Sequence, residues 1–351
     1  MTLPNVLPLA LGLILFSFFV TSILIIPYIN LLYRLHLTRR KEAPRRGKVP
    51  IFDEYHDVKA GTPVGGGVLI ILVVLLLFYL LFPFASHMGV YIRSSHDFKW
   101  ELFAIFFTFL SFGLLGLSDD LMKMFSKPKP GVLGLWFGMT RKTKFILQWV
   151  LAFIVGAILY YKLGIHFLHL PFVNVNINLG FFYLFFSAFV IVTFTNAFNI
   201  TDGLDGLSSG LFLICLVAFG IISSASLDTP LSLFIALLLG SLFAFLYFNV
   251  WPARIFLGDA GALSFGATLA VVGLLTGSIV ALTIVGGVFI IELVSSFVQI
   301  VGWKFLKRPL LPLAPLHNSF LLRGWEEPKI VFRAWLVGIV LAIFGLWLSM
   351  I

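Results

Sequence analysis

Four polar residues recur at every third position of the stretch NAFNITDGLDGL, residues 196–207: Asn196, Asn199, Asp202 and Asp205. On an ideal helix, steps of three residues would fan these side chains over about 180° instead of placing them in one stripe. Gly203 and Gly206 tolerate backbone shapes that other residues avoid. We therefore expect one helix to stop near residue 199 and another to start near 207, so that the four side chains converge on a pocket. A helix cap and a turn would need only one such residue.

The motif GLSDDLMKM, residues 116–124, places Asp119 and Asp120 side by side, with Lys123 one helical turn beyond. Adjacent carboxylates repel each other unless a cation lies close to them. The motif is therefore either a charged functional site or a solvated helix end, in which Asp120 and Lys123 form a weak surface pair. The spacing alone does not separate these two interpretations.

The stretch NVWPARIFLGDAGALSFG, residues 249–266, begins with Asn249 at the end of an apolar run. Phe256 precedes Asp259, which is flanked by glycines where a helix is expected to begin. An acid in this position suits a metal or phosphate site, although a plain helix cap would use the same residue.

A fourth stretch, PLAPLHNSFLLRGWEEPKI at 312–330, mixes apolar residues with His317 and basic residues. This pattern is amphipathic and is typical of a segment at the membrane surface.

These motifs together supply at least five carboxylates and several lysines, among them Lys59, Lys123, Lys142 and Lys144. Mg²⁺ prefers one or two carboxylates completed by phosphate oxygens and water, and phosphoryl transfer depends mainly on positioning and on neutralisation of charge. The pattern predicts a membrane enzyme that joins a water-soluble phosphate compound to a lipid phosphate.

The rest of the chain must hold these motifs inside a membrane, because 60% of its 351 residues are hydrophobic and only 11% are charged. Runs of about 20 apolar residues without alternation predict spanning helices. We predict an all-α polytopic membrane protein that forms a single domain, 1–351. Its ten expected helices are 7–30, 64–84, 100–118, 145–163, 179–197, 208–226, 231–249, 260–278, 280–303 and 330–350.

Basic residues fall almost entirely on one side of this predicted bundle. Of the 24 lysines and arginines, all except Arg93, Lys99 and Lys162 lie with the loops of the side that carries the motifs. Cytoplasmic loops are enriched in basic residues, so we expect both termini outside and the active site on the cytoplasmic face. The same loop charge accounts for the net charge of +9 without a nucleic-acid partner.

The motifs resemble those of the polyprenyl-phosphate N-acetylhexosamine-1-phosphate transferase superfamily, and within it the phospho-N-acetylmuramoyl-pentapeptide transferases. The matching stretches are AGTPVGGG (60–67), GLSDDLMK (116–123), NAFNITDGLDGL (196–207), FLGDAGALSFG (256–266) and PLHNSFLLRGWEEPKIVFRAW (315–335). The resemblance implies a bacterial inner-membrane enzyme of peptidoglycan synthesis and a homodimer. It would move phospho-MurNAc-pentapeptide from UDP-MurNAc-pentapeptide to undecaprenyl phosphate, giving lipid I and UMP.

The resemblance also implies roles for individual residues. Asp259 would be the Mg²⁺ ligand, Asp119 would orient or deprotonate the lipid phosphate, and Asp120 would lie beside it. The substrates would be bound by Asn199, Asp202, Asp205, Asn249, Gln299 and His317, with Phe256 stacked on uracil and Lys59, Lys123 and Lys144 at the phosphates. Either the lipid phosphate attacks directly, or a phospho-aspartyl intermediate forms on Asp119 or Asp120.

Three departures from the family pattern leave the donor sugar open. Asn318 and Ser319 follow His317 where three histidines are usual, Val64 replaces a hydroxyl residue, and Ala262 replaces a serine. A related transferase that starts another envelope glycan is therefore one alternative. A secondary transporter or flippase is another, but transporters hold their carboxylates near the midplane, and of the acids here only Glu292 lies well inside a predicted span.

Overall fold

The computed structural model describes residues 6–39, 59–84, 92–125 and 138–351. Within these ranges ten helices are long and apolar enough to cross a membrane, which agrees with a multi-pass membrane protein. They are α1 (Val6–Arg34), α3 (Gly66–Leu81, continued by η1, Phe82–Phe84), α4 (Phe98–Phe125), α5 (Arg141–Ala157, continued by η3, Ile158–Lys162), α6 (Phe182–Thr201), α7 (Leu207–Ala225), α8 (Thr229–Asn249), α9 (Gly258–Leu275), α11 (Gly287–Val301, continued by η5, Gly302–Leu306) and α13 (Glu327–Ser349).

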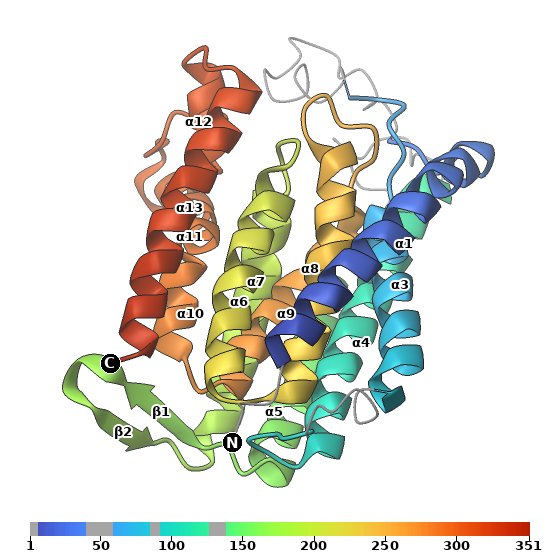
Figure 1. Ribbon diagram of the computed structural model, residues 1–351. Coiled ribbons are helices and arrows are strands. Elements are labelled where there is room, and N and C mark those ends of the chain that lie inside the picture. Colours follow the sequence, from blue (N-terminus) through green and yellow to red (C-terminus); the bar gives the residue numbers. More distant parts are fainter. Residues whose placement is uncertain (1–5, 40–58, 85–91, 126–137) are drawn as a thin grey trace.

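Shorter elements lie at the two ends of the bundle (Figure 1). The antiparallel strands β1 (Phe167–Leu170) and β2 (Val175–Asn178), joined by η4 (Pro171–Val173), lie at the end where α13 finishes. The helix α12 (Leu316–Leu322) lies at the opposite end. Some of the basic residues used to predict the sidedness fall outside the described residues: Arg40, Lys41, Arg45, Arg46, Lys48, Lys127 and Lys129.

The predicted continuous span 280–303 is wrong, because a short helix α10 (Ile279–Val285) ends before Gly286 and α11 starts at Gly287. The physical reason is a close contact with α6. A Cβ at Gly286 would lie 2.5 Å from a ring carbon of Phe194, so only glycine fits there. The adjacent pair of glycines then allows the helix to break, as paired small residues often do.

The helix α9 lies at the centre of the bundle and packs against α3, α4 and α6. Its sequence is rich in glycine and alanine, which let membrane helices approach closely. A Cβ on Gly67 of α3 would lie 2.2 Å from Gly261 Cα, and a Cβ on Gly116 of α4 would lie 2.1 Å from the Asp259 carbonyl oxygen. These contacts hold the start of α9 against the part of α4 that carries Asp119 and Asp120.

The loop before α9 is fixed to the start of α3 by backbone bonds. Phe256 N donates to Pro63 O at 2.8 Å, while Phe256 O accepts from the amides of Gly65 and Gly66 at 3.1 and 2.9 Å. An isolated bridge also joins Thr38, beyond α1, to Pro63. Three segments distant in sequence therefore meet beside the amino-terminal end of α9.

We predict that Gly116→Ala destabilises the protein, because the added methyl group forces α4 away from the α9 backbone. Overpacking of this kind costs about 1–3 kcal/mol. Thermal unfolding in detergent would measure the loss. Gly220→Ala in α7 is the matched control, since its Cβ would make an ordinary 3.5 Å contact with Ile235. Equal melting temperatures for the two variants would contradict this account of the packing.

Candidate active site

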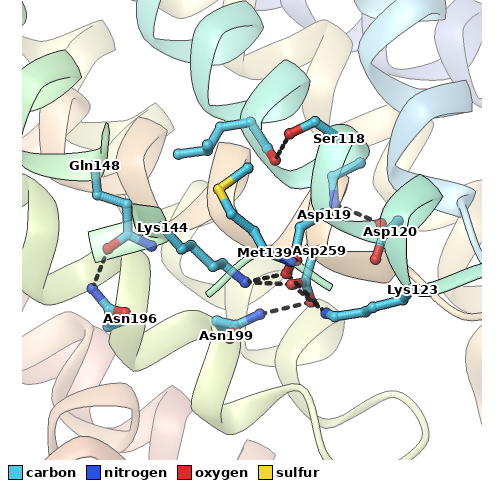
Figure 2. Close-up of polar contacts among 12 residues, drawn as sticks. Ser118, Asp119, Asp120, Lys123, Met139, Lys144, Gln148, Asn196, Asn199 and Asp259 are labelled. Carbon is cyan, nitrogen blue, oxygen red and sulfur yellow. Dashed lines mark hydrogen bonds and ion pairs between the residues drawn. The ribbon is translucent and has the colours of Figure 1, made fainter. Parts of the chain in front are cut away.

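Two carboxylates from different helices are joined by two lysines (Figure 2). Lys123 of α4 lies 3.0 Å from Asp119 Oδ2 and 2.7 Å from Asp259 Oδ2. Lys144 of α5 lies 3.0 Å from Asp119 Oδ2 and also pairs with Asp259 Oδ2. Because like charges at this separation repel, the two ammonium groups offset the repulsion between the carboxylates. The cluster therefore depends on α4, α5 and α9 together.

The remaining carboxylate oxygens of the cluster are also bonded. Met139 N donates to Asp119 Oδ1 at 2.7 Å, and Asn199 Nδ2 of α6 donates to Asp259 Oδ1 at 3.1 Å. These bonds fix the orientation of each carboxylate (Figure 2). The structure therefore brings together five of the residues to which the sequence assigns a role in the site: Asp119, Lys123, Lys144, Asn199 and Asp259.

Asp120, the neighbour of Asp119, contacts the backbone of α9. Its Oδ2 accepts a hydrogen bond from Ala260 N at 3.0 Å, so the carboxylate binds the first turn of α9. The alternative of a solvated helix end with a surface pair between Asp120 and Lys123 is wrong. The helix continues to Phe125, both acids are buried, and Lys123 contacts Asp119 instead.

The break predicted at 196–207 is confirmed, since α6 ends at Thr201 and α7 starts at Leu207. Gly206 has a φ of 78°, a left-handed conformation that favours glycine. Asp205 in this loop pairs with Lys59 at 2.6 Å and accepts a bond from Ala253 N at 2.9 Å. The loop is therefore tied to the segments before α3 and before α9.

Glu327, for which the sequence predicts no role, joins Lys59 and Asp205 in a second charged cluster. Its Oε1 lies 2.5 Å from Lys59 Nζ and accepts a bond from Asp205 N at 2.5 Å. Trp335, further along α13, donates from Nε1 to Gly206 O at 3.2 Å. The motif that contains both residues therefore fastens α13 to the 202–206 loop. Only the scarcity of acids in the chain could have pointed to Glu327.

Asp202 lies in the same loop, where Ser208 Oγ donates to its Oδ1. Burial raises the pKa of Asp202 to about 6, and the charge of Asp259 acts in the same direction. The Ser208 hydrogen bond and the charge of Arg39 partly offset these effects. The carboxylate of Asp202 is therefore costly to ionise within the fold.

Phe256 is half-buried, and the Arg39 guanidinium lies 5.7 Å from the centre of its ring. Such a cation–π contact keeps the arginine at the edge of the site. Arg39 entered the sequence analysis only as a basic loop residue, because nothing in its spacing indicates a partner more than 200 positions away.

Three predicted residues use their amides to hold the scaffold. Asn249 accepts from Ser209 Oγ at 2.6 Å and donates to Ile255 O at 3.0 Å. Asn196 donates to Gln148 Oε1 at 2.8 Å, and Gln299 bonds to the backbone of 310–311. The structure therefore gives these amides positioning contacts in addition to the substrate contacts predicted for Asn249 and Gln299.

The donor set fits a magnesium ion that a substrate helps to bind. Among the described residues no group of three or more His, Cys, Asp and Glu side chains could hold a metal. Mg²⁺ commonly needs only one or two carboxylates, with water and phosphate oxygens supplying the rest. The neighbouring carboxylates of Asp119 and Asp259 provide that number.

We predict that Asp202→Asn stabilises the protein more at pH 7.5 than at pH 4.5. The folded-state pKa of Asp202 is raised from 3.8 to about 6, so the wild type loses stability as the pH rises through this range. The amide does not ionise and avoids a cost of about 1–3 kcal/mol. Thermal unfolding at the two pH values would measure the difference. A melting-temperature difference that does not change with pH would contradict it.

Comparison with known proteins assigns the chain to a family. A model described as Glycosyl transferase family 4 matches residues 102–277. A phospho-N-acetylmuramoyl-pentapeptide-transferase of Rickettsia canadensis (strain McKiel) is 36% identical over 347 residues, covering 93% of this chain and 88% of that protein. Proteins of the same name from Bacillus pumilus (strain SAFR-032) and Geobacillus sp. (strain WCH70) are each 32% identical. They cover 94% and 96% of this chain, and 95% and 96% of their own lengths. The chain therefore belongs to glycosyl transferase family 4, together with the phospho-N-acetylmuramoyl-pentapeptide-transferases.

Proposed function

We propose that this protein transfers phospho-MurNAc-pentapeptide from UDP-MurNAc-pentapeptide to undecaprenyl phosphate, forming lipid I and UMP in peptidoglycan synthesis. Relatives named for this transferase activity match nearly the whole chain. The observation that carries the proposal is the cluster of Asp119, Asp259, Lys123 and Lys144, contributed by three helices. Such a cluster suits two phosphorylated substrates, because they bring negative charges that must be neutralised.

Asp259 is the proposed magnesium ligand, with Asp119 beside it. The ion would supply charge neutralisation at the donor diphosphate. Lys123 and Lys144 are the proposed phosphate contacts, since each ammonium group already lies between the two carboxylates. Asp120 supports the site from behind by holding the first turn of α9.

The geometry favours direct attack by the lipid phosphate over a covalent enzyme intermediate. Both oxygens of Asp119 accept hydrogen bonds or ion pairs, Oδ1 from Met139 N and Oδ2 from the two lysines. A carboxylate held in this way is a weak nucleophile but a well-oriented charge. In the direct step an oxygen of the lipid phosphate bonds to the β-phosphorus. The bond from that phosphorus to the bridging oxygen breaks, and UMP leaves with the electron pair.

The donor pocket is proposed to lie beside this cluster, along the 202–206 loop. Asn199, Asp202 and Asp205 shape it, and Lys59 is held next to Asp205. The ring of Phe256 is proposed to stack on uracil. In this structure the Arg39 guanidinium lies over that phenylalanine ring. Asn249 and Gln299 support the pocket through backbone contacts. His317 reaches the loop at Gly203, where an added Cβ would lie 2.6 Å from its Nε2.

The proposed location is the bacterial inner membrane, with the cluster at the cytoplasmic face and both termini outside. The end of α13 and the β1–β2 hairpin lie at one end of the bundle, and α12 lies at the other (Figure 1). A cytoplasmic cluster can meet a soluble nucleotide sugar and a lipid phosphate at the same surface.

We predict that Asp259→Asn abolishes magnesium-dependent lipid I formation while the protein still folds. Loss of one preorganised charge contact typically raises the barrier by about 3–4 kcal/mol, which lowers kcat roughly 10²–10³-fold. UMP release with added undecaprenyl phosphate would be measured. Asp97→Asn, at an exposed acid ahead of α4, is the control for the same chemical change. Wild-type turnover in the Asp259 variant would overturn the assignment.

Transfer from a related donor sugar is the second candidate function. It is favoured by Asn318 and Ser319, which follow His317 where the family pattern has histidines. Ser319 Oγ bonds to the backbone of Leu313, and Asn318 and Ser319 are both buried. Parallel assays with several UDP-N-acetylhexosamines distinguish the candidates, because only the accepted donor releases UMP and yields a lipid product. Counterflow of the nucleotide sugar without UMP release would instead favour a transporter.

A further inference from the structure

The helix α11 carries a stripe of polar residues on a mainly apolar sequence. Glu292, Ser295 and Gln299 are spaced at i, i+3 and i+7, so they share a face. Each of the three side chains bonds to the backbone of the segment 311–317, which leads into α12. Ser295 Oγ accepts from Leu316 N at 3.0 Å, and Gln299 Oε1 accepts from Leu311 N at 2.9 Å. The stripe therefore fixes the course of residues 310–317 along α11.

The Glu292 carboxylate makes three contacts, all of them with His317. The His317 backbone amide donates to both carboxylate oxygens at 3.2 and 3.3 Å, and Nδ1 lies 3.1 Å from Oε2. Glu292 is 5% exposed and His317 is 2% exposed. An ionised carboxylate only accepts hydrogen bonds, so this contact requires a hydrogen on Nδ1. The contact therefore selects the tautomer of the ring.

The other ring nitrogen points at the loop that carries Asp202 and Asp205. A Cβ on Gly203 would lie 2.6 Å from His317 Nε2, so the imidazole rests against this glycine. Among the residues that the structure describes, Nε2 has no hydrogen-bond partner. With Nδ1 carrying the hydrogen, a neutral ring presents Nε2 as an acceptor.

We propose that Glu292 is a positioning residue that holds His317 as the Nδ1–H tautomer, so that Nε2 accepts a hydrogen bond from a hydroxyl or N–H group of the nucleotide sugar. The inference rests on the proposed function for the identity of that ligand. It also explains why a carboxylate lies inside an apolar helix, where an unpaired charge would be expensive. A carboxylate or carbonyl that accepts a hydrogen bond from one ring nitrogen commonly fixes the tautomer of a functional histidine.

The alternative is that Glu292 only anchors the loop, and Glu292→Gln separates the two roles. A glutamine can still accept from the His317 amide through its carbonyl oxygen, so the anchor survives. Its NH₂ group would now donate to Nδ1, which moves the ring hydrogen to Nε2. The variant therefore keeps the loop in place but converts Nε2 from an acceptor into a donor.

The first measurement is the tautomer itself, by ¹⁵N NMR of the full-length protein labelled at histidine in detergent. His317→Gln identifies the resonance among the seven histidines. We expect the Nδ1–H form in the wild type and the Nε2–H form in Glu292→Gln. Ser295→Ala removes a neighbouring anchor without touching the ring, and it should leave the tautomer unchanged. An unaltered tautomer in Glu292→Gln would overturn the proposal.

The second measurement is steady-state UMP release with UDP-MurNAc-pentapeptide and undecaprenyl phosphate. Loss of one well-formed hydrogen bond should raise the KM for the nucleotide sugar by about tenfold in Glu292→Gln. The KM for undecaprenyl phosphate should stay within about twofold, since this ring does not face the lysine cluster. Equal KM values for the donor in wild type and variant would also overturn the proposal.

The two measurements separate failure of this inference from failure of the proposed function. A wild-type protein that releases no UMP from any nucleotide sugar defeats the proposed function, yet its tautomer still tests the role of Glu292. An active wild type whose Glu292→Gln variant has the same tautomer and the same donor KM defeats the inference alone.

Discussion

The electrostatic balance between buried carboxylates and the two lysines that join them is the constraint on which the rest of the structure depends. Asp119 and Asp259 come from α4 and α9, and neither helix can bring its acid close to the other without a cation between them. Lys144 adds α5 to this arrangement, and Asn199 adds α6. Small residues make this charge arrangement sterically possible, because they let the backbone of α9 approach those of α3 and α4 closely.

A second set of contacts ties the carboxy-terminal part of the chain to the same end of the bundle. Glu327 and Trp335 fasten α13 to the 202–206 loop, while Glu292 fixes His317 against Gly203 from the α11 side. The loop is therefore held by two helices that follow it by more than 80 residues. The substrates that we propose would bind between this loop and the lysine cluster. The contacts above fix the charge and the shape of that region in the absence of substrate.

Much of this arrangement follows from the sequence, because long apolar runs and scarce acids each carry a direct physical meaning. The helices and the break at 202–206 were predicted on those grounds. The interruption at Gly286 was not, because it arises from contact with Phe194 of another helix. The motif of Asp119, Asp120 and Lys123 was ambiguous for a similar reason, since its spacing fits both a functional site and a solvated helix end, and only packing buries the two acids. Arg39 and Glu327 gave no local signal, as their partners are distant in sequence.

The most direct test of the central claim is a double-mutant cycle on Asp259→Asn and Lys144→Gln, measured as kcat/KM for UMP release. If the lysine and the carboxylate act as one unit, the double variant is little worse than either single variant, with a coupling energy of about 1–3 kcal/mol. Losses that simply add would show that the two residues act independently. That result would contradict a site built on charges shared between helices.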